Sequence, residues 1–211
     1  MAHNTSSHEK EIRDAVVIKL RELFPSARII HELNTGHGSN RVDLAAVTTS
    51  QIITAEIKSE KDTLKRLPRQ VKQFKSCSHV TIVAAHAKFF ETFSYFNNRD
   101  LGFRAKEPLA AVNALEWCYP IPDYIRYPHV WDIPASQYRN PDTREVLKLL
   151  WREELITESR KHGISVKTRD TKTDLMNAMY LHMTGLEISK AACRQLRQRE
   201  FAEADPQIGA Y

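Results

Sequence analysis

One stretch, residues 41–59, decides the fold: it reads RVDLAAV (41–47), TTS (48–50) and QIITAEIKS (51–59). Both apolar runs are typical of buried strands, and the polar triplet between them is typical of a turn, so the stretch predicts a β-hairpin. Side chains two residues apart share a face of a strand, which places Glu56 and Lys58 together. The turn brings Asp43 back to the level of Glu56. The sequence therefore predicts two carboxylates and one ammonium at the open end of the hairpin.

A charge inside an apolar strand is costly unless it is paired. One lysine beside one carboxylate would be an ordinary structural ion pair. The second carboxylate gives the site an excess of negative charge, which a hard divalent cation such as Mg²⁺ neutralises through oxygen ligands. The hairpin thus indicates either a structural ion pair or a metal site.

The spacing of these residues resembles the PD-(D/E)XK nuclease superfamily. Its core signature corresponds to Asp43, then twelve residues, then Glu56-Ile57-Lys58, with Val42 where proline is frequent. The likeness is closer to small bacterial and phage members and covers about the first 115 residues. It is carried by Arg41, Asp43 and Leu44, by Glu56 to Glu60, and by Asp62, Leu64, Arg66 and Leu67.

The resemblance implies an α/β restriction-endonuclease-like core, a mixed sheet flanked by helices, and a Mg²⁺- or Mn²⁺-dependent endonuclease or other deoxyribonuclease, a hydrolase of DNA. It implies metal ligation by Asp43, Glu56 and the Ile57 carbonyl, and catalytic roles for Asp43, Glu56, Lys58 and Gln70. Lys58 would position or deprotonate a water, or stabilise developing charge. Glu32 and Glu11 are candidates for further metal ligands, with a solvated helix-start glutamate as the alternative for Glu11. The alternative function is a non-catalytic nucleic-acid-binding or adaptor protein with the same fold.

Basic residues follow the carboxylates directly. Residues 58–75 contain seven basic residues against two acidic ones, and on a helix the basic residues form an arc apart from the apolar stripe. Such an arc is either a solvated face or a surface for phosphates. The sequence predicts DNA contacts for Arg41, Lys61, Lys65, Arg69 and Lys72, and in the C-terminal region for Lys167, Arg169 and Lys172.

The whole chain fits a DNA partner. It has 211 residues, a formal charge of +5 and three widely spaced cysteines. The positive charge permits an anionic partner, and the cysteine spacing argues against a zinc knuckle or a disulfide framework. No apolar run reaches membrane length, and residues 1–10 are too polar for a signal peptide. We therefore expect a cytoplasmic protein without a membrane partner, acting as a homo-oligomer or with other DNA-processing proteins.

Hydrophobic periodicity and turn residues divide the chain into three parts: a nuclease-like domain (1–118), a Pro/Tyr-rich connection that packs on it (119–140) and a small all-helical region (141–205). Within the first, helices are predicted from Ser7, over 61–77 with Pro68 breaking or restarting the helix, and over 87–97. Strands are predicted over 27–33, 41–47, 51–59, 78–85, 101–103 and 109–114. Further helices are predicted over 141–162, 173–183 and 187–201. The order of Leu155, His162-Gly163-Ile164 and Lys172-x-Asp174-Leu175 resembles a SAP module, which implies binding to the DNA backbone; a plain helical hairpin is the alternative.

Overall fold

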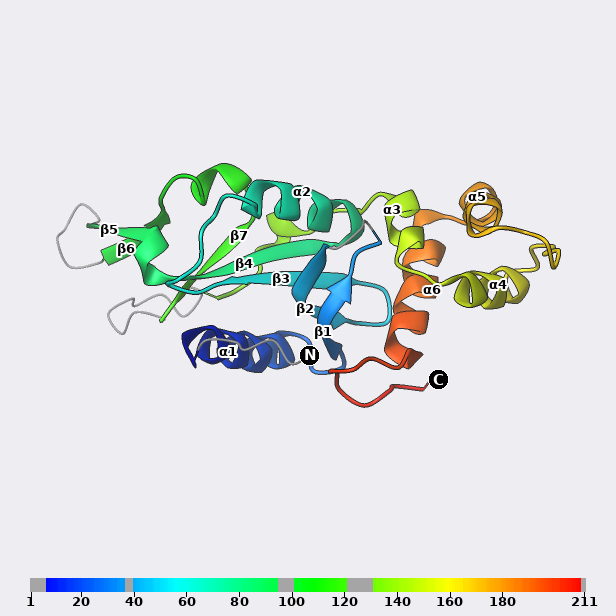
Figure 1. Ribbon diagram of the computed structural model, residues 1–211, viewed down its shortest axis with the longest axis horizontal. Coiled ribbons are helices and arrows are strands. Elements are labelled where there is room, and N and C mark those ends of the chain that lie inside the picture. Colours follow the sequence, from blue (N-terminus) through cyan, green and yellow to red (C-terminus); the bar gives the residue numbers. More distant parts are fainter. Residues whose placement is uncertain (1–6, 37–39, 95–100, 121–130, 210–211) are drawn as a thin grey trace.

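The computed structural model describes residues 7–36, 40–94, 101–120 and 131–209 (Figure 1). Five strands form one mixed sheet in the order β1-β2-β3-β4-β7. The pairs β1–β2 and β2–β3 are antiparallel, whereas β3–β4 and β4–β7 are parallel. Their bounds are β1 Arg28–Asn34, β2 Arg41–Val47, β3 Ile52–Lys58, β4 Val80–His86 and β7 Leu115–Tyr119.

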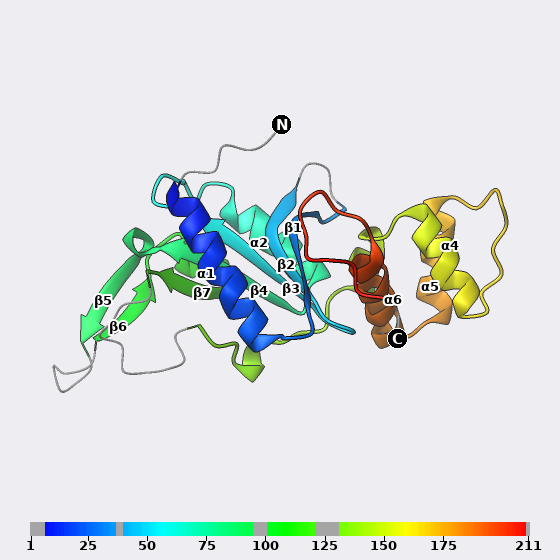
Figure 2. The same cartoon turned by 90° about the horizontal axis from the view of Figure 1, so that it is seen from below.

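Helix α1 (Ser7–Leu23) covers one face of the sheet, and α2 (Leu67–Cys77) covers the other (Figures 1 and 2). The alternation of side chains along β2 explains both layers: Leu44 and Ala46 pack with α1, whereas Ala45 and Val47 share a core with Phe74 of α2. The chain is therefore an α/β protein with a mixed sheet flanked by helices, as the sequence predicts.

Pro68 lies in the first turn of α2. The first backbone N–H groups of a helix have no intrahelical acceptor, so proline is tolerated there. The helix predicted over 61–77 therefore begins only at Leu67, with Pro68 at its start.

The helix predicted over 87–97 is wrong where the structure describes it. Residues Ala87–Phe89 form a single 3₁₀ turn, and β5 (Phe90–Ser94) pairs with β6 (Leu101–Ala105) in a separate two-stranded sheet. Phe90 is buried while Glu91 and Thr92 are exposed, and aromatic and β-branched residues favour a strand. Residues 95–97 of this prediction lie outside the described residues.

The strand predicted over 109–114 is also wrong. Residues Ala110–Val112 form a 3₁₀ turn that ends at Asn113, whose φ of 50° lies in the left-handed region. Only then does β7 begin, and it pairs with β4. Trp131, the first described residue after residue 120, stacks on Trp117 of β7 with ring centroids 4.9 Å apart. This contact confirms that the connection packs on the sheet through an aromatic residue.

The C-terminal region is helical, but the helix predicted over 141–162 is two helices. Their break lies at residues 149–151, where the Glu154 carboxylate accepts the Trp151 N–H at 2.7 Å and caps the second helix. Arg199 donates to the same carboxylate and to the Leu149 carbonyl, so the break is fixed by distant residues. The helices are α3 Thr143–Lys148, α4 Arg152–Lys161, α5 Lys172–His182 and α6 Gly185–Gln198.

Helix α6 joins this region to the sheet. Cys193 and Leu196 share a core with Ile30 and Phe74. After α6 the chain turns back along β1: the His31 N–H donates to the Glu203 carbonyl, and the Asp205 N–H donates to the Ile29 carbonyl. Among the described residues, no helix is long and apolar enough to cross a membrane. The three cysteines, Cys77, Cys118 and Cys193, are free and buried.

Candidate functional site

The hairpin of β2 and β3 brings Asp43 and Glu56 together. Leu44 lies opposite Ala55 in the antiparallel register, so the preceding Asp43 is level with Glu56. The Asp43 Oδ2 accepts the Ile57 N–H at 2.6 Å, which fixes the carboxyl against the neighbouring strand.

Glu56 is the buried centre of the site. Its Oε1 accepts hydrogen bonds from Lys58 Nζ and from Gln70 Nε2, each at 2.7 Å. Its Oε2 is also buried but receives no hydrogen bond from the described residues. The structure therefore brings Asp43, Glu56, Lys58 and Gln70 into one cluster, and leaves one carboxylate oxygen without a donor.

Burial controls the ionisation of both carboxyls. It raises the pKa of Asp43 to about 8, helped by the charge of Glu56 and opposed by the Ile57 amide and by Arg13. Burial also raises the pKa of Glu56, although the charge of Lys58 and hydrogen bonds with Lys58, Gln70 and Asp43 act against it. At neutral pH the pair therefore retains a proton, which a bound cation would displace.

Arg13 of α1 contacts both the backbone and the side chain of Asp43. Its Nη1 donates to the Asp43 carbonyl at 3.0 Å, and its Nη2 lies 3.5 Å from Asp43 Oδ1. The same Nη2 reaches Glu9 at 3.3 Å and Glu32 at 3.4 Å. Arg13 is absent from the sequence-predicted site, although its place beside Ile12 and Val16 on the buried face of α1 is the signal that could have found it.

The two further glutamates predicted near the metal lie in different places. Glu32 lies opposite Asp43 in the register, between the pairs His31–Leu44 and Leu33–Val42, and its φ of 53° is in the left-handed region. Its Oε1 accepts from the Arg13 Nη2 at 3.4 Å. Glu11 is exposed on α1 and makes no hydrogen bond or ion pair with the described residues.

The donor set is compatible with a cation. Asp43, the orphaned Glu56 Oε2 and the neighbouring backbone offer oxygen atoms, which Mg²⁺ and Mn²⁺ prefer. Among the described residues no group of three or more His, Cys, Asp or Glu side chains forms a metal cage. Mg²⁺ commonly binds through one or two carboxylates and keeps waters, so two carboxylates are sufficient.

The basic residues predicted to contact DNA lie on the surface. Lys61 and Lys65 precede α2, and Arg69 and Lys72 lie on it; all four are exposed, as are Arg66 between them and Arg41 at the start of β2. In the C-terminal region Lys167 and Arg169 are exposed. Lys172 is half-buried and donates from Nζ to the Lys148 carbonyl at 3.0 Å, where it caps α3.

Residues 2–103 match a family model described as bacteriophage P4 protein cII. Over 97 residues the chain is 38% identical to Protein cII of Enterobacteria phage P4, a match that covers 44% of this chain and 36% of that protein. The chain thus spans little more than a third of the length of the curated relative it matches. No solved structure matches the chain.

These findings correct the assignment drawn from the resemblance. The matching family model and relative are phage P4 protein cII, not a nuclease, so the PD-(D/E)XK assignment and the hydrolase activity expected from it are wrong. The SAP-like assignment of the C-terminal region stays a prediction, because the match ends at residue 103. The region contains four helices, and Arg152 donates to the carbonyls of Thr168 and Asp170 within the loop that was aligned with that module.

Proposed function

We propose that the protein binds nucleic acid, with duplex DNA as its ligand, through the backbone phosphates. The carrying observation is the α2 basic surface, defined as Lys61, Lys65, Arg66, Arg69 and Lys72. All five side chains are exposed, and none forms an ion pair or hydrogen bond with the part of the chain that the structure describes. Five uncompensated cations within twelve residues supply the positive field that attracts a phosphate backbone.

The repulsion between these cations is a further argument for an anionic ligand. Arg69 and Lys72 both lie on α2, three residues apart, a spacing at which like charges on a helix repel by a few tenths of a kcal/mol. The buried face of α2 consists of Leu67, Val71, Phe74 and Cys77, so packing does not require the cations. An anionic partner would relieve the repulsion.

The double variant Lys65→Gln/Arg69→Gln tests the proposal. Each phosphate contact contributes nearly one unit to the slope of log affinity against log salt concentration. The variant should therefore flatten that slope by up to about two units, and should weaken binding equally for unrelated sequences because backbone contacts do not read bases. Fluorescence anisotropy with a labelled duplex at several salt concentrations measures both effects.

The matched control is Lys10→Gln/Arg160→Gln, which removes the same charge from two exposed residues that have no ion pair in the described chain, one on α1, on the opposite face of the sheet, and one on α4. It should retain the wild-type slope within about half a unit, since these cations lie off the α2 basic surface. Equal flattening in both double variants would show that only net charge matters, and a wild-type protein that does not bind duplex DNA would refute the proposal outright.

We propose second that Asp43 and Glu56 bind a divalent cation, Mg²⁺ or Mn²⁺. The support is the orphaned, buried Glu56 Oε2 beside a second carboxyl whose pKa is raised to about 8. When bound, the cation would add positive charge close to the α2 basic surface, since Gln70 of α2 donates to Glu56. Asp43, Glu56 and the Ile57 carbonyl would hold it, and Arg13 would yield its contact with Asp43.

Thermal unfolding with Mn²⁺ tests the cation site. A cation that binds only the folded state adds about 2.7 kcal/mol to the free energy of unfolding at a hundredfold excess over Kd. The melting temperature therefore rises. The rise should disappear in Asp43→Asn, which keeps an acceptor for the Ile57 N–H but loses the charge. Asp14→Asn, at an exposed position of α1, should keep the rise. Equal Mn²⁺ binding by wild type and Asp43→Asn in calorimetry would exclude the ligand role.

A further inference from the structure

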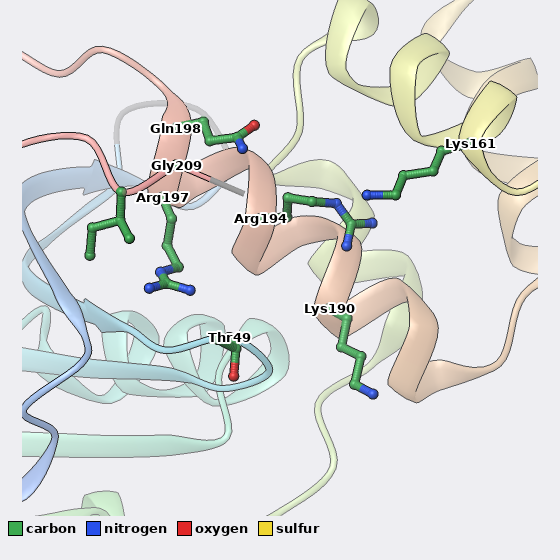
Figure 3. A pocket seen from close by; sticks show the side chains of 8 residues that line it. Thr49, Lys161, Lys190, Arg194, Arg197, Gln198 and Gly209 are labelled. Atoms are coloured by element: carbon green, nitrogen blue, oxygen red, sulfur yellow. The ribbon is translucent and has the colours of Figure 1, made fainter. Parts of the chain in front are cut away.

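A second basic site lies between the C-terminal helices and the sheet (Figure 3). It is a cavity of about 420 Å³, bounded by α4, α6, the turn between β2 and β3, and the chain near residue 208. Its polar lining consists of Lys161, Lys190, Arg194, Arg197, Gln198 and Thr49. We call it the α4–α6 pocket; it shares no residue with the α2 basic surface.

The spacing of residues along α6 explains why the cations converge. Lys190, Arg194 and Arg197 stand at positions i, i+4 and i+7, which share one face of a helix. The other face carries Ile188, Ala192 and Leu196, which are buried. Lys161 comes from the end of α4, and Figure 3 shows its side chain extending toward Arg194. Two helices thus supply charge to one cavity.

Arg194 is held in place by a buried carboxylate. Its Nε donates to Glu158 Oε1 at 3.0 Å, its Nη2 donates to Glu158 Oε2, and Gln195 also donates to Oε1 at 2.6 Å. The hydrogen bond to Glu158 raises the pKa of Arg194. The guanidinium is therefore rigid and fully charged, and Glu158, which is fully buried, compensates this one cation.

The other three cations have no such compensation. Lys161 and Lys190 form no ion pair with a described residue, and the side chain of Arg197 donates only to the Ser26 carbonyl, at 3.3 Å. Among the described residues that line the pocket there is no Asp or Glu. Glu187 of α6 offsets part of the charge of Lys190, but none of these three cations has an ion pair in the described chain. Three positive charges without an ion pair around one cavity favour an anionic ligand.

We infer that the α4–α6 pocket binds a ligand with two or more linked phosphate groups. The cavity has the volume of a small-ligand site, larger than one phosphate requires. A planar guanidinium and flexible ammonium groups are the side chains that hold phosphate oxygens. The Thr49 hydroxyl and the Gln198 amide add neutral donors, and no aromatic ring among the described lining residues could stack on a base. The lining residues would therefore recognise the ligand through its phosphate groups.

Two sources could supply linked phosphates: a free polyphosphate group or the backbone of a nucleic acid. The inference does not depend on the proposed function, because the pocket lies on α4 and α6 and not on α2. Failure of DNA binding at the α2 basic surface would leave it untouched. The test below separates the two sources.

Calorimetry with inorganic tripolyphosphate tests the pocket. The wild-type protein should bind one equivalent, and Lys190→Gln should weaken binding about tenfold, the usual effect of losing one charge-assisted hydrogen bond. Lys190 is exposed, so the variant should fold normally, which its melting temperature verifies. The control Arg160→Gln removes the same charge from the residue next to Lys161, outside the pocket lining, and should bind within about twofold of wild type.

The source is decided by the same variants with a short duplex that carries no terminal phosphate. A tenfold loss for the duplex in Lys190→Gln but not in Arg160→Gln identifies backbone phosphates as the ligand. A loss for tripolyphosphate alone identifies a free polyphosphate group. The inference is overturned if neither ligand binds the wild type saturably, or if Arg160→Gln weakens binding as much as Lys190→Gln.

Discussion

Asp43 and Glu56 are two buried acids that share a small space with one lysine. The ammonium of Lys58 donates a hydrogen bond to Glu56. The Asp43 carboxyl is left with the Ile57 amide and the more distant Arg13 as its partners. This unequal partnership explains why burial raises the pKa of Asp43 as far as about 8. The proton on Asp43 is therefore part of the folded state in the absence of a cation.

That proton links stability to pH. Asp43 has an ordinary pKa near 3.8 in the unfolded chain and about 8 in the folded protein. The folded state binds the proton more tightly, so the stabilisation is complete below about pH 4 and is lost as pH rises through 8. In metal-free buffer the melting temperature should fall from pH 6 to pH 9, and Asp43→Asn should show a clearly smaller fall. Asp14→Asn should behave as wild type; an unchanged pH dependence in Asp43→Asn would contradict the raised pKa.

At this scale the sequence predicts much of the cluster. Period-two alternation and the polar turn are sufficient to place Asp43 level with Glu56 and to put Lys58 on the same face. The partners from other elements could not be predicted in the same way. Arg13 reaches the site only because α1 packs across the sheet, and Glu32, which contacts Arg13, has a left-handed backbone with a φ of 53°.

The elements themselves were predictable where one signal dominates. The hairpin of β2 and β3 and the start of α1 follow from local patterns. The prediction over 87–97 was wrong because clustered phenylalanines suit a helix and a strand alike, and the pairing of β5 with β6 decides between them. The break between α3 and α4 depends on Arg199, about fifty residues away in the chain, which no local pattern reveals.

Gly36 joins two elements by close approach. It has a φ of 80°, and a Cβ atom there would lie 2.9 Å from the Cβ and the carbonyl oxygen of Lys148, at the end of α3. Gly163 has a similar φ of 70°, but its added Cβ would meet open space. Both alanine variants should be destabilised by about 1 kcal/mol from the backbone conformation. Gly36→Ala should lose about 1–3 kcal/mol more, because the loop and α3 must separate.

Urea unfolding of the two glycine variants measures this difference. Because the backbone conformations match, the excess loss in Gly36→Ala reports the contact between the β1–β2 loop and α3. Equal losses of unfolding free energy in the two variants would mean that the loop and α3 can separate without destabilising the protein.

At the scale of the whole molecule, the sheet and the C-terminal helices are tied together. Arg28 of β1 donates to the carbonyls of Leu196, Arg197 and Arg199 at the end of α6. It thereby satisfies acceptors that a helix end leaves open. The α2 basic surface and the α4–α6 pocket are consequently held in one arrangement, since Phe74 of α2 and Leu196 of α6 lie in the same core.

Function was the hardest property to predict at this scale. The α/β class follows from the pattern of elements, but the nuclease assignment rested on three residues of one hairpin and their flanking motif. Similar folds and similar charged clusters serve many roles. The match to phage P4 protein cII over residues 2–103 is information that spacing alone does not contain.

The chain after α6 has a consequence for solubility. β1 is an outer strand of the sheet, and an uncovered outer strand is a template on which another chain can add a strand and aggregate. Residues 203–205 occupy that position: Ala204 bridges to Ile30, and the Asp205 carboxylate accepts the Ile29 N–H at 3.0 Å. Residues 203–205 therefore cover part of the outer edge of β1, and a protein shortened before Glu203 should aggregate more readily even if its core stayed intact.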